Sequence, residues 1–248
     1  MKKCYASVLG DCAGKLSREH YVSKGLIDLG QDRPSEILLG GILDIGTPAS
    51  SKNLAVSKIL CEQHNSLLSD LDAEVIRLAT SILEWNSNGG DAKHIFNGEF
   101  LLRWKIKSLL GFVKAKKDSR EIIRLSSFEQ LTKWAFAREN IPSHIGISVP
   151  HSQITFPAAA MRDGKCPPWA LSLLLDPFNR ISGLQTWFYP LDLTLDLTLD
   201  FRGQSSMSQT QRFQPNQIIF LSERREGQLT LNFAWRDWTG GTVTYQLD

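Results

Sequence analysis

Four residues near the start of the chain have the types and spacing of a zinc site. Cys61 and His64 stand three positions apart in the segment ILCEQHNSL, a spacing at which two ligands on one tight turn reach the same ion. Cys4 and Cys12 form a second pair upstream. Together they make a Cys₃His set, which suits tetrahedral zinc and predicts a structural zinc ion. The alternative is that three buried cysteines fall near a histidine by chance.

Glu19 and His20 are a second candidate for chemistry, because an acidic residue directly precedes a histidine in the segment LSREHYVSKGLI. Neutral imidazole titrates near working pH, so His20 could take a proton from an attacking water. The alternative is a helix cap at Ser17, although a capping box would place Glu or Gln where His20 stands. Arg18 and Lys24 flank the pair and would either neighbour a bound phosphate or be ordinary surface charges.

The composition is that of an ordinary soluble protein. The chain has 248 residues, of which 42% are hydrophobic and 22% charged, enough for one large domain or two modest ones. No run approaches the roughly 20 apolar residues that span a bilayer, and the N-terminal apolar stretch breaks at Asp11. We therefore expect a cytoplasmic protein with no membrane partner. Four cysteines in such a chain indicate thiols or metal ligands, and Cys166 is expected to be a packing residue.

Three regions differ in pattern and predict an α+β protein. Residues 1–75 mix short strands, loops and a helix, residues 76–140 are helical, and residues 141–248 are rich in proline and alternating apolar residues. A helix with one apolar face is predicted by steps of three and four between Leu71, Val75, Leu78, Ile82 and Trp85. Strands are predicted at LDLTLDLTLD (191–200), NQIIFLSE and QLTLNFAW, and a Ser-capped helix at SSFEQLTKWAFAREN.

The basic residues are unevenly distributed. The net charge is +2, but residues 93–133 hold ten Lys and Arg residues against four Asp and Glu residues. Such a cluster suits contact with a phosphate backbone, and a solvated helix face explains it equally well.

The order of these residues resembles the zinc-containing branch of the HNH (His-Me finger, ββα-metal) endonucleases. That family has two cysteine knuckles, an acid-His pair after the first, a middle Asn, and L-C-x-x-C-H at the second. Over about residues 1–68 this chain supplies, in order, Cys4, Cys12, Glu19, His20, Asn53, Leu60, Cys61, His64 and Asn65. It departs from the pattern in spacing its first cysteine pair as C-x7-C. His64 and Asn65 also replace the usual zinc cysteine and final histidine, and the segment between His20 and Asn53 is longer than in a minimal motif.

The resemblance implies a zinc-stabilised ββα-metal (HNH) nuclease module at residues 1–75, followed by a helical region that packs on the module or links it, and by a β-rich C-terminal domain. It implies metal-dependent hydrolysis of DNA phosphodiester bonds. His20 would be the general base on a strand, Asn53 would orient it, and Asn65 would begin the following helix. Glu19 and Asn65 would hold a catalytic Mg²⁺ or Mn²⁺ ion. The structural zinc would be bound by Cys4, Cys12, Cys61 and His64.

Two further hypotheses concern the biological setting. The nuclease could be the effector of a bacterial antiviral defence system, with residues 76–248 docking a sensor or ATPase partner. In a different class, the same knuckles could form a non-catalytic zinc module that binds nucleic acid or a partner protein.

Overall fold

The computed structural model describes most of the chain outside several loops. The described residues are 4–29, 39–40, 55–116, 122, 127–142, 145–150, 169–188, 193–199, 210–222, 226–236 and 242–247. Asn53 and Cys166, for which the sequence predicts an orienting and a packing role, lie outside these ranges. Helices and several sheets are combined, which confirms the α+β class. None of the helices in the described ranges is long and apolar enough to cross a membrane.

The N-terminal part contains two paired strands and, directly after the second of them, a short helix. Its elements are the 3₁₀ helix η1 (Tyr5–Leu9), β1 (Leu16–His20), α1 (Lys24–Asp28), β2 (Leu39–Gly40), β3 (Val56–Cys61) and α2 (Glu62–Ser66). Strands β1 and β3 form an antiparallel two-stranded ribbon in which Leu16 lies opposite Cys61 and His20 opposite Val56. The register shifts between Ser17 and Glu19. Ser17 and His20 both belong to strand β1, and His20 is its last residue. The alternative expectation of a helix cap at Ser17 is therefore wrong.

Three longer helices follow: α3 (Ser69–Asn88), α4 (Gly98–Lys116) and α5 (Phe128–Ala135). The five apolar residues that predict a helix over 69–88 are all buried on one face of α3. The Ser127 hydroxyl caps α5 by accepting the Gln130 N–H at 3.1 Å, as the sequence predicts.

Two further sheets contain the remaining strands. The six-stranded sheet has the order β2-β6-β7-β8-β5-β9, and the four-stranded sheet the order β12-β10-β11-β4. Their strands are β4 (Ala92–Asn97), β5 (Gly146–Pro150), β6 (Trp169–Leu175), β7 (Ile181–Phe188), β8 (Leu193–Thr198), β9 (Thr210–Phe213), β10 (Gln217–Ser222), β11 (Gln228–Ala234) and β12 (Thr242–Leu247). The predicted strands are confirmed as β8, β10 and β11. Strand β4 lies within the region expected to be helical, and it pairs in parallel with β11.

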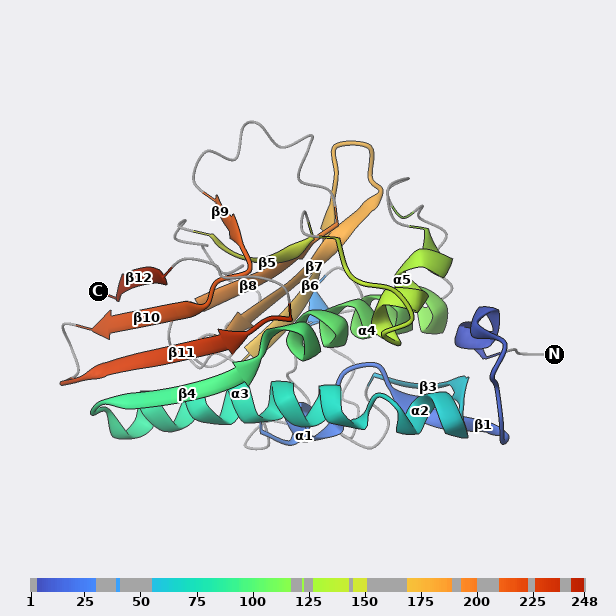
Figure 1. The fold of residues 1–248 in the computed structure, drawn as a ribbon, viewed down its shortest axis with the longest axis horizontal. Helices are drawn as coiled ribbons and strands as arrows, with labels where there is room; N and C mark the ends of the chain where they lie inside the picture. The colour runs from blue at the N-terminus through green and yellow to red at the C-terminus, as the bar shows by residue number, and fades with distance from the viewer. Residues whose placement is uncertain are drawn as a thin grey trace.

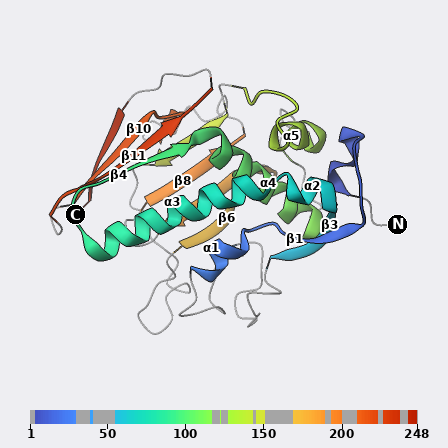
Figure 2. The ribbon, with the colours of Figure 1, turned by 60° about the horizontal axis from the view of Figure 1, so that its bottom comes forward.

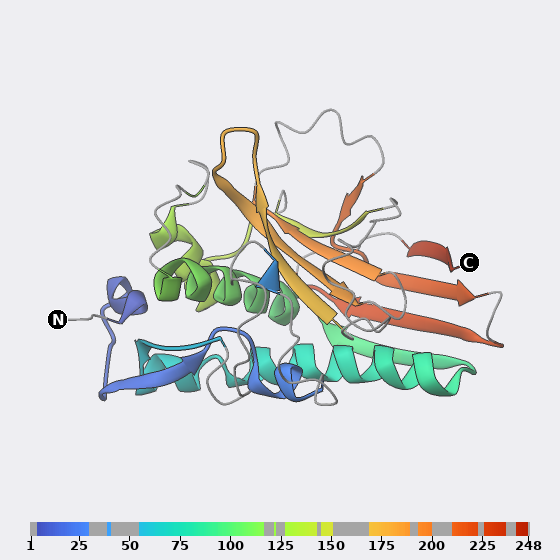
Figure 3. The same ribbon diagram turned by 180° about the vertical axis from the view of Figure 1, so that it is seen from behind.

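Helix α4 is the central element of the fold. It contacts α3 and α5, strand β3 of the ribbon, and strands β7, β8 and β11 of the two larger sheets. The ribbon and the C-terminal strands lie toward opposite ends of the molecule (Figure 1). Figure 2 shows α3 and α4 running along one side of β6 and β8, and Figure 3 shows α4 between α3 and the six-stranded sheet.

Three basic residues of the segment 93–133 lie inside the protein. Arg103, Lys105 and Lys107 project from α4 and are all buried. Arg103 donates to the Trp134 carbonyl at 2.5 Å, and Lys105 donates to the Thr186 hydroxyl at 2.5 Å. Both expectations for the cluster, a phosphate-binding surface and a solvated helix face, are therefore wrong at these three positions. Polar partners inside the fold make their burial possible.

Candidate functional site

The side chains of Cys4, Cys12, Cys61 and His64 come together in one cluster. Their candidate ligand atoms all lie within 4.8 Å of one another. The His64 Nδ1 atom lies 3.5 Å from the Cys4 sulfur, 3.6 Å from that of Cys12 and 3.1 Å from that of Cys61. Tetrahedral zinc with ordinary Zn–S and Zn–N bonds would separate sulfur and nitrogen by about 3.6 Å. The cluster could therefore hold a metal ion, and its donor set and spacing fit zinc.

The end of the ribbon at which β1 begins and β3 ends, together with a short turn, brings these ligands close to one another. The Glu62 N–H donates to the Lys15 carbonyl at 3.0 Å, which fixes the start of α2 beside the beginning of β1. Burial raises the pKa of the Cys61 thiol, but N–H groups of the His64 and Ala13 backbone and the His64 ring outweigh it and lower the pKa to about 7. A thiolate is the form that binds metal, so Cys61 is suited to be a ligand.

The Asp11 carboxylate contacts the His64 ring nitrogen that does not face the cysteines. The His64 Nε2 atom lies 2.8 Å from the Asp11 Oδ1 atom, and Arg138 from beyond α5 forms an ion pair with the same carboxylate. A carboxylate on one imidazole nitrogen orients the ring and directs the lone pair of the other nitrogen toward a metal. The sequence prediction missed both residues. Asp11 could have been noticed as the neighbour of Cys12, but nothing in the sequence connects it to Arg138.

Glu19 lies away from this cluster and points into the protein. Its side chain is buried, and its Oε1 atom lies 2.8 Å from the Nζ atom of Lys107 on α4. Lys107 also donates to the Oδ1 and Oδ2 atoms of Asp72 on α3, at 2.7 and 2.8 Å. Two carboxylates from separate elements thus converge on one buried ammonium group. The sequence prediction included Glu19 but missed Lys107 and Asp72.

The burial of this acidic cluster shifts the pKa values of its members. Burial raises the pKa of Glu19 to about 7, although the charge of Lys107 lowers it in part. Burial also lowers the pKa of Lys107, but the charges of Glu19 and Asp72 outweigh that effect and raise it. The ammonium form of Lys107 is therefore favoured by the carboxylates that surround it.

His20 is half-buried beside the same cluster. Its Nε2 atom is buried and makes no hydrogen bond within the described part of the chain. Burial lowers the pKa of His20, and the positive charges of Lys107 and Arg18 lower it further. A neutral imidazole with a free nitrogen has the form that a general base requires.

Asn65 lies on α2 but is the fourth of its five residues, whereas the resemblance implies a place at the start of the helix. It precedes Asp72 by seven residues, and the intervening Leu67 and Leu68 keep near-helical backbone angles. Seven residues advance a helix by about 10 Å. Because Asp72 is the helix residue that reaches the Lys107 contact with Glu19, Asn65 stands about two turns away from that contact. Among the predicted site residues, Asn65 is the sequence neighbour of the zinc-ligand candidate His64, and Glu19 is the one that contacts Lys107.

Packing of α4 fixes the position of the acidic cluster. The Trp104 indole donates to the Ser23 hydroxyl at 2.7 Å, and Ser23 in turn hydrogen-bonds to Asp72. One turn after Lys107, Gly111 lies directly against Tyr21, because a Cβ atom at this glycine would stand 2.1 Å from the Tyr21 Cβ. The close approach that glycine allows holds α4 against the end of β1.

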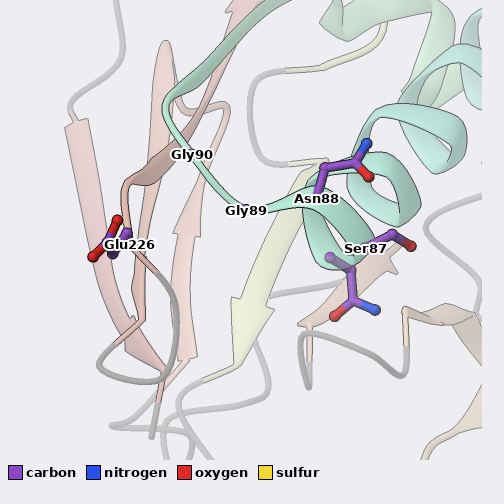
Figure 4. Close-up of a pocket in the computed structure, with 6 residues that line it drawn as sticks. Ser87, Asn88, Gly89, Gly90 and Glu226 are labelled. Atoms are coloured by element: carbon purple, nitrogen blue, oxygen red, sulfur yellow. The ribbon is translucent and has the colours of Figure 1, made fainter.

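A hollow outside these clusters lies at the turn between α3 and β4. It has a volume of about 430 Å³ and is lined by Asn86, Ser87, Asn88, Gly89, Gly90 and Glu226. Figure 4 shows the Glu226 side chain across the Gly89–Gly90 backbone from Ser87 and Asn88. The lining of the hollow contains one ionisable side chain, that of Glu226, and no histidine, cysteine or lysine, so it offers no acid–base pair for catalysis.

Comparison of the chain with family models, curated proteins and solved structures finds no match.

Proposed function

We propose that this protein is a metal-dependent endonuclease of the HNH type that hydrolyses DNA phosphodiester bonds. The observation that carries the proposal is the joint presence of a Cys₃His cluster and a β1–β3 ribbon followed by a helix, with His20 at the end of the first strand. Zinc in the cluster would have a structural role, since it would tie η1, the ribbon and α2 together.

In this proposal His20 acts as general base. A water oxygen forms a bond to phosphorus, its proton passes to His20, and the ester bond to the leaving oxygen breaks, after which that oxygen takes a proton from solvent water and leaves as an alcohol. A divalent ion would stabilise the charge on the phosphate. Glu19 would supply one oxygen ligand for that ion, and the α2–α3 segment would supply another, for which the sequence names Asn65. Asn53 would orient His20.

The test is incubation of zinc-loaded protein with plasmid DNA, with and without Mg²⁺ or Mn²⁺. We expect nicking that requires the divalent ion and that His20→Ala reduces by about 10²–10⁴-fold, the usual contribution of a general base. His94→Ala is the matched control, because His94 lies on β4 next to Ser81 and outside the site. Cleavage by His20→Ala at the rate of the unaltered protein would refute the nuclease assignment, whatever the zinc content.

A non-catalytic zinc module that binds nucleic acid or a partner protein is the second candidate. The observation in its favour is that Glu19 is buried and already paired with Lys107. Retention of DNA in a mobility-shift assay, without cleavage under any divalent ion, would support this candidate. A role as the nuclease effector of a defence system, with a sensor or ATPase docked on residues 76–248, remains a separate proposal. Co-purification of such a partner from a bacterial host would test it.

A further inference from the structure

We propose that the carboxylates of Glu19 and Asp72 form the divalent-cation site of the nuclease, and that the Lys107 ammonium occupies this site in the ion-free protein. The inference rests on the proposed function and deepens it, because it assigns Asp72, in place of Asn65, as the helix residue that holds the ion.

The convergence of oxygen atoms on one point is the first observation. The Lys107 Nζ atom has three carboxylate oxygens at 2.7 to 2.8 Å, one from Glu19 and two from Asp72. Hard cations such as Mg²⁺ and Mn²⁺ prefer carboxylate oxygens as ligands, at about 2.1 Å for Mg²⁺. After withdrawal of the ammonium, each oxygen would have to move by only about 0.7 Å to reach that distance.

Unpartnered polar atoms around this point are the second observation. The Tyr5 hydroxyl and His20 Nε2 are both buried and make no hydrogen bond within the described residues. Tyr5 is buried among aromatic rings, and the charges of Glu19 and Asp72 both act on its hydroxyl. Buried polar atoms normally have partners. Two such atoms beside one acidic cluster indicate a site for a hydrated ion, whose water ligands would supply those partners.

The charge and the access route also agree with a cation. Two carboxylates and one ammonium give the buried cluster an excess negative charge, which a divalent ion would compensate. The Asp72 side chain is 28% exposed, whereas Glu19 and Lys107 are almost completely buried. An ion would therefore enter past Asp72. Asn65 stands about two helical turns before Asp72, which is the helix residue that contacts the Lys107 ammonium.

Mn²⁺ binding, measured on zinc-loaded protein by the loss of the free Mn²⁺ signal in electron paramagnetic resonance, tests the assignment without any need for activity. We expect Asp72→Asn to weaken Mn²⁺ binding on the order of 10–100-fold. This variant still leaves Lys107 paired with Glu19, so folding should be preserved. Asp70→Asn is the matched control, because it removes an exposed carboxylate from the same turn of α3. Asn65→Ala should also bind Mn²⁺ normally. Unchanged binding by Asp72→Asn, or an equal loss in Asn65→Ala, would overturn the proposal.

A separate test addresses whether the Lys107 ammonium occupies the cation site in the ion-free protein. Lys107→Met leaves the two carboxylates without a cation, so Mn²⁺ should raise the thermal midpoint of this variant more than that of the unaltered protein. An equal or smaller rise would overturn this part of the proposal. If Lys107→Met does not fold, the Mn²⁺ affinity of Asp72→Asn decides whether the two carboxylates form a cation site.

Plasmid cleavage by the same preparations separates the two proposals. Mn²⁺ binding that depends on Asp72, in a protein that never cleaves DNA, would support the cation site and refute the nuclease. Cleavage that depends on His20 but not on Asp72 would support the nuclease and refute this cation site.

Discussion

Replacement of Lys107 by Met should destabilise the ion-free, zinc-loaded protein severely. Lys107 is fully buried, and its ammonium group lies 2.7 to 2.8 Å from oxygens of Glu19 and Asp72. Methionine fills a similar volume, so the main loss is electrostatic. Removal of one partner from a buried ion pair typically costs about 3–5 kcal/mol, because the remaining charge stays in the interior without compensation. Glu19, whose pKa is already about 7, can take up a proton once Lys107 is absent, and Asp72 is partly exposed, so we expect the lower part of this range.

Urea unfolding measured by tryptophan fluorescence gives this free energy directly. The matched control is Lys133→Met, because Lys133 also pairs with two carboxylates, those of Glu129 and Glu139, but at the surface. Solvent screening makes such pairs weak, so the control should change stability little. A double variant with Glu19→Gln should recover part of the loss, since one of the stranded carboxylates is then neutral. Equal stabilities of Lys107→Met and Lys133→Met would refute the role of the buried ammonium.

Three further predictions concern the zinc cluster and the packing of α4. Cys61→Ser should release zinc and unfold the ribbon, since structural zinc supplies folding energy. Elemental analysis with circular dichroism will show whether zinc and folded structure are lost together. Asp11→Ala should fold but bind zinc about 10–100-fold more weakly in a chelator competition, because His64 loses the group that orients it; unchanged affinity would contradict this role. Gly111→Ala should destabilise the protein by about 1–3 kcal/mol through its clash with the residue 21 backbone and Cβ. The control Gly25→Ala, which meets only the flexible tip of Ile76, should cost clearly less, and a reversed order in urea unfolding would refute the packing argument.

Local spacing explains what could be predicted from the sequence. The Cys61-x-x-His64 pair lies on one turn, so its spacing alone places two ligands together, and the scarcity of cysteine directs attention to Cys4 and Cys12. The apolar period of α3 and the alternation of β8, β10 and β11 are likewise local properties of the chain. The strand β4 was missed because its partner, β11, is far away in sequence and supplies the context that makes the segment a strand.

The tertiary structure alone decided the surroundings of Glu19. In the sequence, Lys107 is one member of a basic cluster, and Asp72 is an ordinary acidic residue in the first turn of a helix. They are 35 residues apart, and no spacing rule connects either one to Glu19. The packing of α4 against the ribbon and α3 brings the three charges together in the interior, where each is stable only because the others are present. A lysine that would be solvated on an isolated helix thus becomes the centre of a buried carboxylate cluster, and this outcome depends on which helix face the rest of the fold covers.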